Sequence, residues 1–88
     1  MHKAEIIERL AQELGSSKAH AARQLEATLS VLTQALVEGH DVQLRGFGAF
    51  QHKVLKGRMA ALPTGERLRV PERKTVRFKV AKAILDQL

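Results

Sequence analysis

Basic side chains concentrate in the second half of the chain, where they could bind phosphate groups. Residues 45–88 carry eleven lysines and arginines against three acidic residues, a net charge of +8, whereas residues 1–44 carry four against six, a net charge of −2. The eleven are Arg45, Lys53, Lys56, Arg58, Arg67, Arg69, Arg73, Lys74, Arg77, Lys79 and Lys82. A basic surface of this density is typical of proteins that bind polyanions. The chemistry predicted from these residues is phosphate neutralisation.

Composition narrows the kind of polyanion. A pI near 10.3 suits nucleic acid, an anionic membrane surface or an acidic protein partner. The chain has no Trp or Tyr, and its three aromatic residues are Phe47, Phe50 and Phe78. Proteins that bind single strands usually stack successive bases on exposed aromatic rings. Duplex DNA is therefore the leading candidate partner.

Residue types that serve catalysis or metal binding are present, but without a suitable pattern. The four histidines, His2, His20, His40 and His52, are dispersed and lack metal-ligand spacing, and there is no cysteine. The serines have no base or acid arranged around them. The glycines beside Phe47 are not followed by the lysine and serine of a phosphate loop. We expect no enzymatic activity, no cofactor, no metal and no small-molecule substrate.

The first 39 residues are predicted to form a helical hairpin. Apolar residues recur at helical spacing over residues 3–14, and Gly15 ends that pattern. Ser16 or Ser17 can cap a second helix, which extends to about Glu38 and ends at Gly39. Its stripe of leucines is long enough to serve as a two-fold interface.

After Gly39 the hydrophobic period changes to two, which indicates strands. Alternation covers residues 42–45, 50–54, 67–70 and 75–80, with the glycines at 46–48 as a turn. The three phenylalanines are expected in the core. His52 alternates with Phe50 and Val54, so it is expected either to be partly buried or to add charge at the base of the hairpin described next. Residues 81–88 are predicted to form a closing helix.

Residues 56–66 lack enough large apolar side chains to bury a face of their own. They contain Gly57, Pro63 and Gly65, and Pro63-Thr64-Gly65 has good turn chemistry. This composition predicts a β-hairpin arm that extends from the body. A two-stranded ribbon alone is marginally stable in water, so the arm is expected to be mobile until it contacts a partner.

These elements predict an α+β fold in one domain over residues 1–88. The helical hairpin and dimer contact occupy 1–39, a three-stranded antiparallel sheet occupies 40–80 with the arm at about 55–73, and the last helix occupies 81–88. A chain of this size buries only a small core, so a homodimer is expected. No apolar run is long enough for a signal peptide or a membrane span, and a cytoplasmic location is expected.

The chain resembles the bacterial HU/IHF histone-like DNA-binding proteins. The resemblance rests on the order of elements, the Gly46-Phe47-Gly48-Ala49-Phe50 motif, the proline-bearing arm and Phe78-Lys79 before the last helix. It covers essentially the whole chain. It implies an intertwined dimer whose two arms embrace the DNA minor groove, and an architectural, nucleoid-associated protein that bends or compacts duplex DNA with little sequence preference.

The resemblance also implies which residues contact DNA. Pro63 would be the wedge that unstacks a base step, although a turn proline is the simpler interpretation. Arg58, Arg67, Arg69 and Arg73 would line the arm and its base, and Lys3, Lys18, Lys74, Lys79 and Lys82 would extend the basic track along the flank. Arg45, Lys53, Lys56 and Arg77 complete the predicted interface. For Lys3 the alternative is a surface ion pair with an acid such as Glu26.

The arm departs from the family pattern. Its tip is one residue shorter than usual, and Met59-Ala60-Ala61-Leu62 is apolar where relatives usually carry a basic run. The hypothesis that follows is weaker bending than in a typical relative, whereas an apolar tip that inserts more deeply is the opposite interpretation. Two other functions stay open: an IHF-like, sequence-selective bender, and a basic module that docks on an acidic protein, RNA or an anionic surface.

Overall fold

The computed structural model describes all 88 residues, with helices α1 (Lys3–Leu14) and α2 (Lys18–Val37) at the N-terminus. Gly15 ends α1 in the left-handed conformation, with φ of 62°. The Ser17 hydroxyl oxygen accepts a hydrogen bond from the His20 backbone N–H at 3.1 Å, which caps α2. The Gly39 N–H donates to the Leu36 carbonyl at 3.1 Å beyond the end of α2. The predicted helical hairpin and its stop signals are confirmed.

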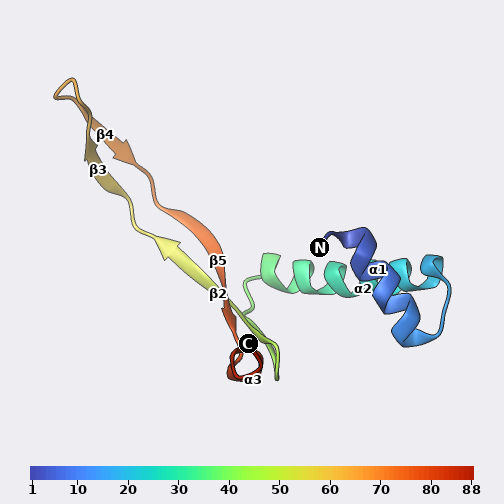
Figure 1. The fold of residues 1–88 in the computed structure, drawn as a ribbon. Coiled ribbons are helices and arrows are strands. Elements are labelled where there is room, and N and C mark those ends of the chain that lie inside the picture. The colour runs from blue at the N-terminus through green and yellow to red at the C-terminus, as the bar shows by residue number, and fades with distance from the viewer. The chain divides into compact units, whose positions relative to one another are not determined.

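Five strands and a short helix follow, in the order β1 (Val42–Leu44), β2 (Gly48–Leu55), β3 (Arg58–Ala61), β4 (Arg67–Val70), β5 (Arg73–Val80) and α3 (Lys82–Leu85). Strands β1, β2 and β5 form an antiparallel sheet in the order β1-β2-β5. Strands β3 and β4 form a separate two-stranded ribbon that continues from β2 and β5 (Figure 1). The predicted three-stranded sheet and hairpin arm are confirmed.

The last helix is shorter than predicted. Of residues 81–88, only Lys82–Leu85 are helical, and hydrogen bonds from Gln87 to Ile84 and from Leu88 to Leu85 tighten the following residues into turns. Ala81 is the N-cap of α3, with extended φ of −71° and ψ of 147°, and its N–H donates to the Phe47 carbonyl at 2.9 Å.

The chain divides into two compact units, Met1–Ala35 and Leu36–Leu88. Ala11 of α1 and Ala21 of α2 are buried, and no large apolar side chain is. Lys3 of α1 forms an ion pair with Glu26 of α2, and hydrogen-bond ladders join the strands of the sheet. No helix is long and apolar enough to cross a membrane.

The phenylalanines do not form a buried core within one chain, contrary to the prediction. Their rings do cluster, with centroids 5.4 Å apart for Phe47 and Phe78 and 4.8 Å apart for Phe50 and Phe78. Phe47 nevertheless remains 50% exposed and Phe78 44% exposed. Val76 on the same side of the sheet is 39% exposed, so much of the aromatic side is open to solvent in one chain.

Candidate nucleic-acid interface

The strand register sorts the side chains of the sheet onto two chemically different faces. Cross-strand partners point to the same side, and successive residues point to opposite sides. One side receives Phe50 opposite Phe78 and His52 opposite Val76. The other side receives four cations, Lys53, Arg73, Arg77 and Lys79, opposite Thr75, Leu55, Gln51 and Ala49 respectively. We call these four residues the cationic sheet face.

The cationic sheet face follows from its local sequence. In residues 73–80 the apolar side chains of Val76, Phe78 and Val80 alternate with Arg77 and Lys79, so a strand conformation separates them automatically. Lys74 falls on the aromatic side, where it lies opposite Val54. The register thus separates Lys74 from the other cations of β5.

Gly46 and Gly48 shape the end of this face. Gly46 adopts a φ of 81° in the turn that the Phe47 N–H closes onto the Leu44 carbonyl at 2.9 Å. Gly48 is buried, and a β-carbon there would lie 2.4 Å from Phe78 Cζ. The predicted turn is confirmed, and close packing explains why position 48 is glycine.

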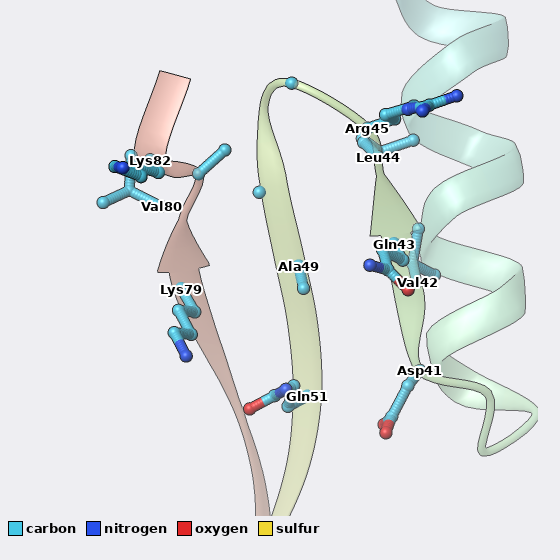
Figure 2. Close-up of a pocket in the computed structure, with 13 residues that line it drawn as sticks. Asp41, Val42, Gln43, Leu44, Arg45, Ala49, Gln51, Lys79, Val80 and Lys82 are labelled. Atoms are coloured by element: carbon cyan, nitrogen blue, oxygen red, sulfur yellow. The ribbon is translucent and has the colours of Figure 1, made fainter. Parts of the chain in front are cut away.

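A shallow hollow of about 480 Å³ lies at this end of the cationic sheet face (Figure 2). Ala49, Gln51 and Gln43 come from neighbouring strands, while Lys79, Lys82 and Arg45 supply three positive charges against the one negative charge of Asp41. The amides can hydrogen bond and the three cations can neutralise phosphate oxygens, so the hollow suits a strand of nucleic acid passing over the sheet.

The arm also has two different sides. Arg69 lies opposite Met59 and Arg67 opposite Ala61, whereas Leu68 lies opposite Ala60 on the other side of the ribbon. Arg58 shares that second side with its partner Val70. Arg67 and Arg69 therefore share one side of the arm with Met59 and Ala61, and Arg58 shares the other side with Ala60, Leu68 and Val70.

The tip of the arm is a hairpin with a three-residue loop. The Gly65 N–H donates to the Leu62 carbonyl at 2.9 Å, the Leu62 N–H donates to the Glu66 carbonyl at 2.7 Å, and Gly65 has a φ of 86°. This pattern is that of a tight turn followed by a glycine in the left-handed conformation. The predicted Pro63-Thr64-Gly65 turn is confirmed, and Pro63 lies exposed within it.

Every residue predicted to contact DNA is exposed. These residues are Lys3, Lys18, Arg45, Lys53, Lys56, Arg58, Pro63, Arg67, Arg69, Arg73, Lys74, Arg77, Lys79 and Lys82. Among the cations, Lys3 alone has an ion-pair partner in the chain, Glu26, and both side chains of that pair are more than half exposed. The remaining predicted cations are available to an external anion. The sequence did not predict the hollow's amides, Gln43 and Gln51, because they carry no charge.

At the border of the basic surface, His52 and Asp41 form a close pair. The Asp41 Oδ1 atom lies 3.0 Å from His52 Nδ1 and accepts the His52 backbone N–H at 2.9 Å. The hydrogen bond to the Asp41 carboxylate, aided by the Leu36 carbonyl, raises the pKa of the His52 imidazole. The His52 backbone N–H and then its ring lower the pKa of the Asp41 carboxyl. The expectation of a partly buried His52 is confirmed, because its side chain is 28% exposed.

Known proteins with similar sequences are DNA-binding proteins. The sequence profile of a family described as "Bacterial DNA-binding protein" matches residues 1–88. Among curated relatives, the DNA-binding protein HU-beta of Neisseria meningitidis serogroup A is 43% identical over 89 residues, covering 100% of both chains. The DNA-binding protein HU of Thermotoga maritima is 35% identical and is covered over 99% of its length.

Solved structures give the same result. The HU protein in an Anabaena HU–DNA cocrystal structure superposes with a TM-score of 0.87 at 28% identity, covering 99% of this chain and 96% of that one. An HU mutant from Thermotoga maritima superposes with a TM-score of 0.72 at 31% identity, covering 99% and 97%. The chain with the cationic sheet face and the proline-tipped arm belongs to the bacterial DNA-binding protein family, the family of the HU proteins.

Proposed function

We propose that this chain is an architectural protein of the nucleoid that binds double-stranded DNA mainly through phosphates and with little sequence preference, and that it bends or compacts the duplex. The observation that carries the proposal is the register of β2 and β5, which gathers Lys53, Arg73, Arg77 and Lys79 on one sheet face. Phosphate contacts carry no base information, so such a face binds many sequences. The DNA in the Anabaena HU cocrystal supports the choice of partner.

The arm supplies the second part of the proposed interface. Arg67 and Arg69 on one side of the ribbon can reach phosphates, and Pro63 at the tip can press against a base step. No catalytic step is assigned to any residue. Because the tip is shortened, we keep the hypothesis that this chain bends DNA less than a typical relative does.

We propose that the working form is a homodimer. The exposed side chains of Phe47, Val76 and Phe78 form an apolar surface on the aromatic side of the sheet. Burying apolar surface between two copies stabilises both, at roughly 25 cal/mol per Å² removed from water. The cationic sheet face points the other way, so dimerisation through the aromatic side leaves it open to DNA.

The proposal is tested by measuring duplex affinity as a function of salt. If six to ten phosphates are neutralised, affinity falls by about 10³- to 10⁵-fold between 50 and 200 mM salt. The double variant Arg77→Gln with Lys79→Gln should bind all duplexes more weakly and lower the slope of log affinity against log salt by about 0.9 for each lost phosphate contact.

The matched control is Arg9→Gln with Arg23→Gln, which removes the same charge from the helices. If both double variants lose affinity equally, net charge alone explains binding and the cationic sheet face is not the interface. Loss on one sequence only would indicate the sequence-selective alternative. Wild-type affinity that hardly changes with salt would favour docking on a different partner.

A further inference from the structure

His52 has a hydrogen-bond acceptor at each nitrogen of its ring. Nδ1 lies 3.0 Å from Oδ1 of Asp41, and Nε2 lies 2.8 Å from the carbonyl oxygen of Leu36. The same Asp41 oxygen accepts the His52 backbone N–H at 2.9 Å. The ring thus bridges the last turn of α2, the connection before β1, and strand β2.

This geometry fits one protonation state. A neutral imidazole carries a single N–H, so it can donate to Asp41 or to Leu36, and its second nitrogen then faces an oxygen lone pair. Only the imidazolium donates to both. The Leu36 carbonyl can take this second donor in addition to the Gly39 N–H, because a carbonyl oxygen has two lone pairs. As one of the last carbonyls of α2 it also favours a positive charge.

We propose that His52 is a proton-dependent clamp, which as an imidazolium holds the α2–β1 connection to strand β2 and which releases one of its two ring contacts when it loses the proton. His52 lies on the aromatic side of the sheet, away from the cationic sheet face, whereas its partner Asp41 also lines the hollow. The clamp binds a proton, and the bound proton stabilises residues 36–55.

The surrounding charges favour the bound proton overall. Asp41 is the charged partner from the connection, and Leu36 contributes its carbonyl dipole. Lys74 of β5 opposes the charge on His52, and Lys53 of β2 favours ionised Asp41. The remaining titratable groups of the connection, Glu38 and His40, approach each other at 3.7 Å.

The direction of the pH effect follows from both groups. His52 has a raised pKa, so its stabilisation is complete below its ordinary value of about 6.5 and is lost as the pH rises through the higher value of the folded protein. Asp41 has a lowered pKa, so its stabilisation is present above about 3.9 and is lost as the pH falls through the lower folded value. The clamp therefore works best between about pH 4 and 6.5 and weakens as the pH rises through the raised pKa of His52 in the folded protein.

The direct test is an NMR titration of the histidine rings in the full chain without DNA, in the wild type and in Asp41→Asn. The asparagine keeps an oxygen for the His52 backbone N–H but removes the charge. We expect both ring nitrogens of wild-type His52 to be protonated at pH 6, and the titration midpoint to lie at lower pH in Asp41→Asn. A single neutral tautomer at pH 6, or equal midpoints in the two proteins, would overturn the clamp.

A stability measurement tests the consequence. We expect His52→Gln to lower the urea midpoint at pH 6 and to have a smaller effect at pH 9, all at one protomer concentration. His20→Gln is the control, since it removes a histidine whose ring has no ion pair, and its urea midpoint should follow that of the wild type. A His52→Gln effect of equal size at both pH values would show that the ring acts by packing alone. DNA affinity is not the readout, so this result is independent of the proposed function.

Discussion

Gly48 leaves no room for a side chain beside Phe78, because a β-carbon at position 48 would lie 2.4 Å from Cζ of the Phe78 ring. The Lys79 carbonyl oxygen would lie 2.5 Å from the same atom, and a strand backbone cannot yield as a flexible side chain can. Both the aromatic cluster and the backbone of β5 therefore lie close to Gly48.

Gly48→Ala should destabilise the protein by about 1–3 kcal/mol, the usual cost of overpacking a close contact. Urea unfolding at fixed protomer concentration measures the change. Ala49→Gly, one residue along on the other side of the strand, is the control and should cost about 0.5–1 kcal/mol through backbone entropy. An alanine at position 48 that leaves the midpoint unchanged would show that Phe78 and the Lys79 carbonyl do not crowd this position.

Phe78→Ala should weaken the proposed homodimer. The ring is 44% exposed in one chain, and its loss would remove a large apolar contact from the aromatic side of the sheet. Truncating a buried phenylalanine to alanine typically costs about 3–5 kcal/mol, so the dimer should dissociate at a concentration at which the wild type remains associated.

Sedimentation equilibrium over a range of concentrations measures this association. Met59→Ala is the matched control, because Met59 is 57% exposed on the arm and should leave the dimer intact. A wild-type chain that sediments as a monomer at all concentrations would contradict the prediction.

Much of this fold could be predicted from the sequence because its signals are local. Gly15 and Gly39 end the helices, and the change from helical to alternating spacing after Gly39 places the sheet. The three-residue tip was likewise readable from Pro63-Thr64-Gly65, because turn chemistry depends on neighbouring residues.

What the sequence could not provide depends on register and on long-range contacts. The bridge from Asp41 to His52 spans eleven residues, and the separation of Lys74 from the cationic sheet face follows from which residue of β2 it faces. The exposure of Phe78 was missed because alternation shows which side chains share a face but not whether anything covers it.

Glu26→Gln should strengthen DNA binding by releasing Lys3 from its ion pair. The pair is exposed on both sides, so it contributes about 0–1 kcal/mol, and the gain in affinity should be at most about fivefold. Competition binding at low salt measures it. Glu8→Gln makes the same change in net charge on the exposed surface of α1. Equal gains in the two variants would show that overall charge is responsible and that Lys3 has no special role.

Pro63→Ala should reduce the bend in bound DNA only slightly, given the short three-residue loop and the apolar residues before it. Energy transfer between dyes at the two ends of a short duplex reports the bend. Thr64→Ala is the control within the same loop. A sharp wild-type bend that disappears in Pro63→Ala would instead assign the proline a full wedge role at a base step.

The ladder between the arm and the sheet is interrupted on both strands. Pairing ends at Leu55 and Arg73 and resumes at Arg58 and Val70, and Pro71 in the gap has no N–H to donate. The ribbon can therefore open without disturbing the ladder of the sheet. A protease that cuts the opened ribbon would leave the cationic sheet face intact, and bound duplex would shield the cleavage site. The amount of full-length protein would then depend on how much of it is occupied by DNA.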